Sequence, residues 1–270
     1  MSEENSETTV ATVATTAAHE TGAPDIKKLF EAGAHFGHKT SRWNPKMAPF
    51  IHSKRGDSYI INLEKTVEQL NKALPFIVAT VASGKQILFV GTRKQFREII
   101  ANAATAVGQP FVVERWLGGM LTNFTTISSQ VKKLKLLEKK MDSGELANRY
   151  NKLEVQRFQE EIDALNVKYG GIKELRGRPG ALFVASVVTD ANAVREAARM
   201  NIPVVGICDT NADPTDVDYV IPCNDDAIAA VQLVTDYVAA AVREGNAKVA
   251  KKEDDKAATR TTDVAAKNAE

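Results

Sequence analysis

The chain has 270 residues, of which 26% are charged and 44% hydrophobic, and its formal net charge is +1. A chain of this length can bury a full hydrophobic core, while its near-neutral charge argues against a general binder of polyanions. No apolar run approaches the about 20 residues that a membrane-spanning helix needs, and the acidic first residues lack the basic start of a secretory signal. We therefore expect a cytoplasmic protein with no membrane partner.

Both ends of the chain are predicted to be disordered tails. Residues 1–24 are rich in Thr, Ala and Glu and show neither a helical nor a strand period, and residues 246–270 mix Lys, Asp, Ala and Thr in a similar way. Such segments carry too little periodic apolar surface to offset the entropy lost on ordering.

A short helix is predicted between Pro24 and Gly33, because three apolar side chains there share one face. The next residues, 34–47, contain a glycine and a proline that argue against any regular element, and their aromatic residues alternate with basic ones. Trp43 can either fold onto the core or stack against RNA. Composition leaves both interpretations open.

Strands and helices then alternate. The predicted strands are 57–63, 86–91, 111–113, 181–186, 202–207 and 219–221. The predicted helices are 64–83 with a kink at Pro75, 92–107, 192–200 and 224–243. This alternation implies right-handed crossovers and a parallel sheet covered on both faces. The predicted fold class is α/β, with a doubly wound, flavodoxin- or Rossmann-like, mainly parallel sheet in a globular domain of residues 25–121 and 171–245.

A helical hairpin, residues 122–170, is predicted as an insertion into that domain. The preceding sequence RWLGGMLTN, residues 115–123, has two adjacent glycines that suit a sharp exit, and Thr122 or Asn123 can cap the first helix. Apolar residues recur at three- and four-residue steps from Phe124 to Met141, which span roughly 27 Å as a helix. A return arm follows a turn at 142–145. We interpret the pair as an antiparallel coiled coil, whose lysines on their own indicate only a solvated face.

Charge is distributed unevenly along the chain. Residues 39–55 contain five basic residues and no acid, whereas residues 204–236 contain seven aspartates and no Lys or Arg. This asymmetry predicts a basic face for an anionic partner and an acidic 209–226 region that faces protein or solvent. The only cysteines, Cys208 and Cys223, lie beside apolar strand residues and are expected to be buried thiols.

The main alternative is an enzyme, because doubly wound sheets bind ligands at the carboxyl ends of their strands. The segment 91–94 follows a strand and opens a helix, but it lacks the glycine spacing of a dinucleotide or phosphate loop. Two imidazoles of His35 and His38, with His52 as a third, could approach a metal, yet no fourth ligand is fixed. We therefore predict no catalytic residue, cofactor or metal, and keep a small-molecule enzyme that oligomerises through the hairpin as the competing hypothesis.

Several motifs together resemble one known family. They are GAHFGH (33–38), RWNPKM (42–47), IINLEKT (60–66), ILFVGT (87–92), RWLGGMLTN (115–123), DTNADP (209–214) and IPCNDDAI (221–228). In this order they are similar to the family of the second protein of the bacterial small ribosomal subunit, and the resemblance covers about residues 26–245.

The resemblance implies a non-catalytic role in translation. It implies binding to small-subunit 16S rRNA, not DNA, near the neck between head and body, and help in docking the large mRNA-binding first protein of that subunit. Basic residues at two separated places suit phosphate contacts on RNA of defined shape. The predicted RNA-contacting residues are Lys39, Arg42, Trp43, Lys46, Lys54, Arg55, Arg93, Lys94, Arg97, Arg115, Lys132, Lys133, Lys135, Lys139, Arg176 and Arg178.

Overall fold

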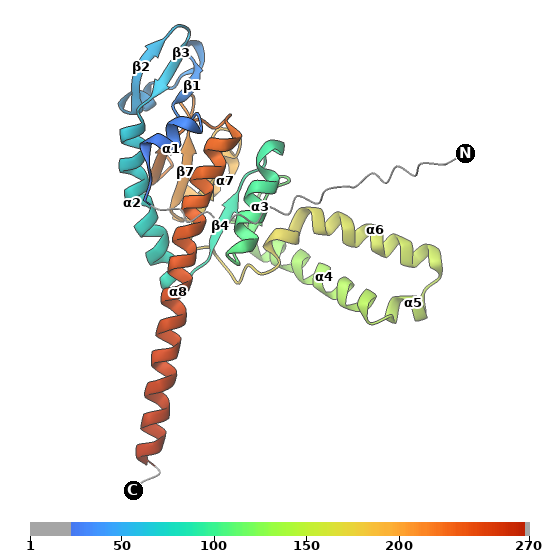
Figure 1. The fold of residues 1–270 in the computed structure, drawn as a ribbon. Helices are drawn as coiled ribbons and strands as arrows, with labels where there is room; N and C mark the ends of the chain where they lie inside the picture. The colour runs from blue at the N-terminus through green and yellow to red at the C-terminus, as the bar shows by residue number, and fades with distance from the viewer. Residues whose placement is uncertain (1–22, 268–270) are drawn as a thin grey trace, which may run out of the picture.

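A five-stranded parallel sheet forms the centre of the computed structural model, which describes residues 23–267, with side chains up to residue 250 except at 147 and 148 (Figure 1). Its strands are β4 (Ile87–Val90), β5 (Phe111–Val112), β6 (Ala181–Val184), β7 (Val204–Cys208) and β8 (Tyr219–Pro222). The strand order is β5-β4-β6-β7-β8 and every neighbouring pair is parallel. This confirms the predicted mainly parallel, Rossmann-like sheet, and the order is the flavodoxin-like one.

Helices cover both faces of this sheet because alternate strand residues point to opposite sides. On one face, Phe89 and Phe183 pack in a core with α2 (Leu63–Ala82), α3 (Arg97–Ala106) and α8 (Ile228–Lys267). On the other, Leu88 and Leu182 pack with α7 (Ala191–Arg199) and with Trp116, Met120 and Leu121. Every residue of β4, β6 and β7 is buried, as expected for strands covered on both faces.

The long helices differ from the prediction mainly at their ends. Asn62 caps α2 by accepting a hydrogen bond from the Glu64 amide at 2.9 Å, and the helix continues through Pro75. Helix α8 continues past its predicted end at Arg243 to Lys267, so the backbone of residues 246–267 is helical where we expected a disordered tail. The predicted N-terminal tail falls, apart from its last two residues, outside the described part of the chain. No helix within residues 23–267 is both long and apolar enough to cross a membrane.

A second, three-stranded antiparallel sheet lies at one end of the molecule (Figure 1). It consists of β1 (Phe36–Lys39), β2 (Ile51–Arg55) and β3 (Ser58–Ile61) in the order β1-β3-β2. The prediction that residues 34–47 hold no regular element was therefore wrong at β1. Two short 3-10 turns follow, η1 (Thr40–Arg42) and η2 (Pro45–Phe50), and η2 contains Pro45 and Pro49.

Gly37 misled the prediction because it was taken for a strand breaker. A Cβ atom at this position would lie 2.6 Å from Cγ2 of Thr210. The glycine therefore lets β1 approach the turn after β7, and the Thr210 hydroxyl accepts a hydrogen bond from the His38 amide at 2.9 Å. A glycine inside a strand often marks such a close backbone approach.

Two long helices, which follow β5 and precede β6 in the sequence, project from the globular part (Figure 1). Helix α4 (Phe124–Asp142) packs against α6 (Lys152–Tyr169), with Ile127, Leu134 and Ile162 buried. The return arm is interrupted, because a short α5 (Glu145–Arg149) precedes α6. Asn151 starts α6 with a reciprocal capping box, in which its side chain and that of Glu154 each accept from the other's amide, at 2.9 and 3.1 Å.

Candidate nucleic-acid interface

The exit of the chain into the projecting helices is fixed by Glu196 of α7. Its Oε1 accepts hydrogen bonds from the Gly119 amide at 2.8 Å and from the Trp116 indole N–H at 3.1 Å. Its Oε2 accepts from the Leu121 amide at 3.0 Å and from the Thr122 amide at 3.3 Å. Partial burial alone would raise the pKa of this carboxyl, but these donors outweigh it and hold the pKa below its usual value.

Sequence reasoning missed Glu196, which reads as one more polar residue of an amphipathic helix. It expected the cap from Thr122 or Asn123. Asn123 does occupy the N-cap position of α4, but its side chain accepts from the Thr126 hydroxyl at 3.0 Å rather than from a helix amide. Of the two glycines, Gly119 has a φ of +87°, in the left-handed region where glycine is favoured.

Four predicted RNA contacts on the small sheet and its η1 turn are exposed, and none has an ion-pair partner among the described residues. These four, called the small-sheet cations below, are Lys39, Arg42, Lys54 and Arg55. Lys46 differs, because its ammonium is 3.0 Å from the Asp213 carboxylate and donates to the Thr215 hydroxyl at 2.6 Å. Lys46 is thus held by the acidic turn after β7.

Trp43 packs on its own protein. Its ring lies 5.1 Å from that of Tyr59 on β3, tilted by 46°, and the residue is partly buried. A contact between Trp43 and RNA stays a prediction.

The three predicted residues near the start of α3 are placed differently from one another. Lys94 is exposed on η3 (Lys94–Phe96). Arg97 pairs with the Glu114 carboxylate. Arg93 points inward, where its guanidinium lies 2.7 Å from Oδ1 of Asp226 and donates to the Asp225 carbonyl at 2.7 Å. Of the three, only Lys94 keeps its charge free of internal partners among the described residues.

The predicted residues on and beside the projecting helices also fall into two groups. Lys133 pairs with Glu161, and Lys135 with Glu174 at 2.9 Å. Arg115 and four others are exposed without an ion-pair partner in the described part of the chain. The four others, called the stalk-side cations below, are Lys132, Lys139, Arg176 and Arg178.

The small-sheet cations and two of the stalk-side cations lie at opposite edges of the parallel sheet. Arg176 and Arg178 precede β6 and therefore lie near the amino edge of the parallel sheet. The small sheet lies over the carboxyl edge, where His38 of β1 contacts Asp209, the residue after β7, with 2.8 Å between Nδ1 and Oδ2. The arrangement can hold two separate anionic surfaces at once.

The carboxyl edge is also where a doubly wound enzyme would bind its ligand, at the switch point between β4 and β6. Here the chain's own side chains occupy that place. The Thr92 hydroxyl donates to Asp190 at 2.7 Å, and the Arg93 Nε donates to the Thr189 hydroxyl at 2.8 Å. Burial raises the pKa of the Asp190 carboxyl despite the bonds from Thr92.

Four residues from three separate segments of the chain meet at this edge. His38 lies between Asp209 and Asp226, with 3.3 Å from its Nε2 to Oδ2 of Asp226. Asp225 is buried beside them, and its Oδ2 accepts from the Ser186 hydroxyl at 2.7 Å. The hydrogen bond with Asp209 raises the pKa of His38 against the opposing effect of burial, while burial raises the pKa of Asp225.

This cluster corrects the prediction for the acidic 209–226 region and the suggestion that the three histidines lie together. The acidic 209–226 region is not a single outward surface, because Asp209 and Asp225 are each 1% exposed. The three histidines are not together either. His35 stacks on Phe30 with 4.3 Å between ring centroids, burial lowers its pKa, and His52 is exposed on β2. Cys208 and Cys223 are buried free thiols as predicted, and burial raises the pKa of each.

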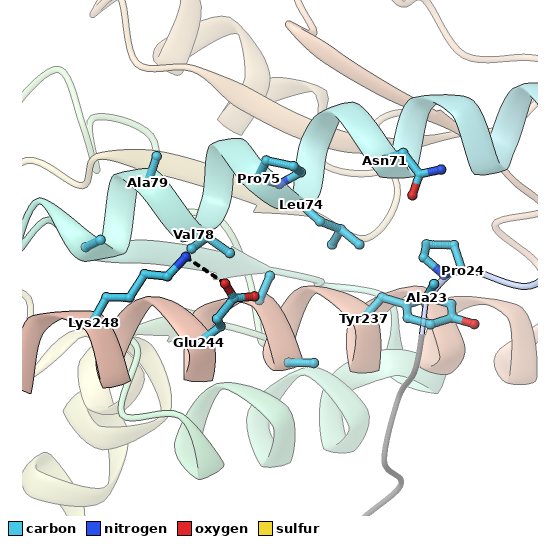
Figure 2. A pocket seen from close by; sticks show the side chains of 13 residues that line it. Ala23, Pro24, Asn71, Leu74, Pro75, Val78, Ala79, Tyr237, Glu244 and Lys248 are labelled. Atoms are coloured by element: carbon cyan, nitrogen blue, oxygen red, sulfur yellow. Dashed lines mark hydrogen bonds and ion pairs between the residues drawn. The ribbon is translucent and has the colours of Figure 1, made fainter. Parts of the chain in front are cut away.

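A groove of about 620 Å³ runs between α2 and α8 (Figure 2). Its walls are mainly apolar, from residues such as Leu74, Val78 and Tyr237, and its charged lining residues, Glu244 and Lys248, pair with each other at 2.7 Å. The groove therefore offers no reactive pair of acid and base.

Comparisons with known proteins place the chain in one family of ribosomal proteins. The sequence matches the family described as Ribosomal protein S2 over residues 29–245. It is 49% identical over 220 residues to the small ribosomal subunit protein uS2 of Roseiflexus sp. (strain RS-1), which covers 82% of this chain and 84% of the relative. It is 48% identical over 220 residues to the protein of the same name from Chloroflexus aggregans (strain MD-66 / DSM 9485), covering 82% of this chain and 92% of the relative. The chain belongs to the ribosomal protein S2 family, whose members are structural, non-enzymatic components of the small ribosomal subunit.

Proposed function

We propose that this chain acts in translation, in the bacterial cytoplasm, by binding 16S rRNA of the small subunit through two separated basic surfaces. The observation that carries the proposal is the separation of the small-sheet cations, over the carboxyl edge of the parallel sheet, from the stalk-side cations, which lie on α4 and before β6. Each set consists of exposed Lys and Arg side chains without internal partners among the described residues. Such side chains bind phosphates and position a protein on folded RNA.

The projecting helices supply the reach for the second surface. We propose that residues 122–170 form a coiled-coil hairpin inserted into one globular domain of residues 25–121 and 171–245. The packing of α4 on α6 through Ile127, Leu134 and Ile162 supports this, and so does the fixed root at Glu196. Lys133, Lys135, Lys46, Arg93 and Arg97 carry less weight as RNA contacts because each already has a carboxylate partner.

Reversing the charge of small-sheet cations tests the RNA-binding proposal. The variant Lys39→Glu, Arg42→Glu and Arg55→Glu leaves Lys46 and its Asp213 partner intact. We expect it to be lost from small subunits during a high-salt wash that retains the unaltered chain, because each reversed residue would repel a phosphate.

The matched control reverses three lysines on the α2 and α8 face, Lys65, Lys72 and Lys248, which have glutamate partners. Its net charge changes equally, so it separates a local contact from the effect of total charge. Equal retention of the two variants on washed subunits would refute a contact through the small sheet.

The family resemblance also supports a role in docking the mRNA-binding first protein of the subunit. We propose this as a second function of the same chain. Subunits assembled without this chain should lack the first protein, and adding the chain back should restore it. Subunits that keep their full complement of the first protein without this chain would contradict the proposal.

A further inference from the structure

We propose that His38, Asp225 and Asp226 form a binding site for a divalent transition-metal ion such as Zn²⁺. Each of these residues offers one ligand atom, and the three atoms lie within 4.8 Å of one another. The site lies at the carboxyl edge of the parallel sheet, and its three candidate ligands are not among the residues proposed to bind RNA.

The orientation of His38 is the first argument for a cation. Its Nδ1 lies 2.8 Å from Oδ2 of the buried Asp209. A carboxylate only accepts hydrogen bonds, so Nδ1 carries the proton and the lone pair of a neutral ring is on Nε2. Nε2 faces Oδ2 of Asp226 at 3.3 Å, so these two atoms either share a proton on a charged imidazolium or can both bind a cation placed between them.

Asp209 and His38 therefore have the relation that metal-bound histidines usually show. A second-sphere carboxylate holds the ring through one nitrogen and makes the other a better ligand. The 3.3 Å separation of the two candidate ligand atoms also fits a tetrahedral ion with bonds of about 2.0–2.1 Å, whose ligand atoms are roughly 3.3 Å apart. The wider separations within the site require the ion to draw its ligands together.

An unpaired oxygen on Asp225 is an independent argument. The residue is 1% exposed, and its Oδ1 has no hydrogen-bond partner. Its Oδ2 is already used by the Ser186 hydroxyl at 2.7 Å and lies 3.3 Å from the Arg93 guanidinium. A buried carboxylate oxygen without a donor is costly, and a metal ion would satisfy it.

Arg93 is the nearest positive group and does not fill the site. It lies 2.7 Å from Oδ1 of Asp226, which leaves Oδ2 of that residue toward His38. Asp226 thus presents one oxygen to Arg93 and the other to His38, while Asp225 has one oxygen bound by protein donors and one without a partner. The cluster brings three carboxylic acid side chains together with one guanidinium and one imidazole, so its acidic groups outnumber its permanently positive group.

The ligand set favours a transition metal over Mg²⁺ or Ca²⁺. Imidazole nitrogen suits zinc and its neighbours, whereas magnesium and calcium prefer oxygen ligands alone. Asp226 is exposed, with 61% of its side chain accessible, which leaves a path for the ion and room for water to complete the coordination.

The test uses the full chain, stripped with a chelator and then titrated with Zn²⁺ by calorimetry, with metal content measured after gel filtration. We expect one zinc ion per chain. His38→Gln and Asp226→Asn should each weaken binding at least about 10-fold, and Asp209→Asn should weaken it about 10- to 100-fold without removing a ligand. His52→Gln and Asp216→Asn are matched controls, with exposed side chains outside the site, and should bind like the unaltered chain.

X-ray absorption of the Co²⁺-substituted chain provides a second readout. It should show only nitrogen and oxygen neighbours, including one imidazole. Sulfur in the coordination sphere, less than one zinc per chain, or equal affinity of the unaltered chain and the Asp226→Asn variant would overturn the proposal. Asp226 is largely exposed, so this variant decides the question even if replacement of His38 prevents folding.

Discussion

At the residue scale, one carboxylate determines where the projecting helices leave the globular part. Glu196 accepts from three backbone amides and the Trp116 indole, which together order residues 116–122. Irregular backbone near a core must find partners for its amides, and here a side chain from a different helix supplies them. The direction of the projecting helices therefore depends on α7.

The substitution Glu196→Gln should destabilise this root. Gln keeps one acceptor oxygen but turns an NH₂ group toward amides that also donate, so at least two hydrogen bonds to a charged group are lost. We expect a loss of about 1.5–3 kcal/mol in the free energy of unfolding, measured by urea denaturation. Glu98→Gln, at an exposed position of α3, is the control and should change stability by no more than about 0.5 kcal/mol.

The same site predicts a dependence on pH. Since the folded pKa of Glu196 lies below its ordinary value of 4.5, its stabilisation is complete above that value and is lost as the pH falls through the folded pKa. The amide resonances of Gly119 and Leu121 should therefore titrate with a midpoint below 4.5. A midpoint above 4.5, or an unchanged unfolding curve for Glu196→Gln, would contradict this account.

At the element scale, the two projecting helices are stabilised by very few buried side chains. Leu134 of α4 is completely buried, whereas Leu136, two residues later on the same helix, is 54% exposed. Ile127 at the start of α4 packs in the core beside the sheet, but the rest of the pair extends away from the sheet and depends on its own few contacts (Figure 1).

Leu134→Ala should loosen the projecting helices without unfolding the sheet. Removing a fully buried leucine costs about 2–5 kcal/mol, and this thin interface has little else to keep α4 against α6. Hydrogen exchange should accelerate in residues 124–169 while β4, β6 and β7 stay protected. Leu136→Ala is the matched control and should leave exchange unchanged. Equal effects of the two substitutions would show that these helices do not depend on Leu134.

The elements were largely predictable because their signals are local. Strands such as β4 and β6 are continuous apolar runs between turn residues, and α4 has a clear helical period. Prediction failed where a distant contact overrides local preference. Strand β1 contains a glycine, Gly37, because Thr210 leaves no space for a Cβ atom at that position. The return arm is divided at Asn151, which forms a capping box inside an otherwise helical pattern.

At the scale of the whole molecule, the tertiary arrangement decides which charged residues are available. The sequence predicted the basic surfaces as groups, but it could not show that Lys46 and Arg93 are held by aspartates from other segments. Nor could it show that His38 meets Asp209 and Asp226, because these lie 171 and 188 positions further along the chain. Contacts between residues so far apart in the sequence depend on strand order, which local sequence patterns do not encode.

Two distant basic surfaces on one rigid body should contribute independently to RNA binding. Their effects should add, because side chains that are far apart and share no partners rarely couple. Replacing the four small-sheet cations by Gln, or the four stalk-side cations by Gln, should each lower the slope of log affinity against log salt concentration by about 3, at roughly 0.7–0.9 per lost phosphate contact.

Affinity for small subunits depleted of this protein, measured across a series of KCl concentrations, checks the prediction. The variant with both sets replaced should show the sum of the two decreases. A matched control that replaces Lys46, Lys133 and Lys135, whose charges already have carboxylate partners, should change the slope by less than about 1. If the small-sheet cations account for the whole salt dependence, the molecule binds RNA through that surface only, and the projecting helices serve a different partner.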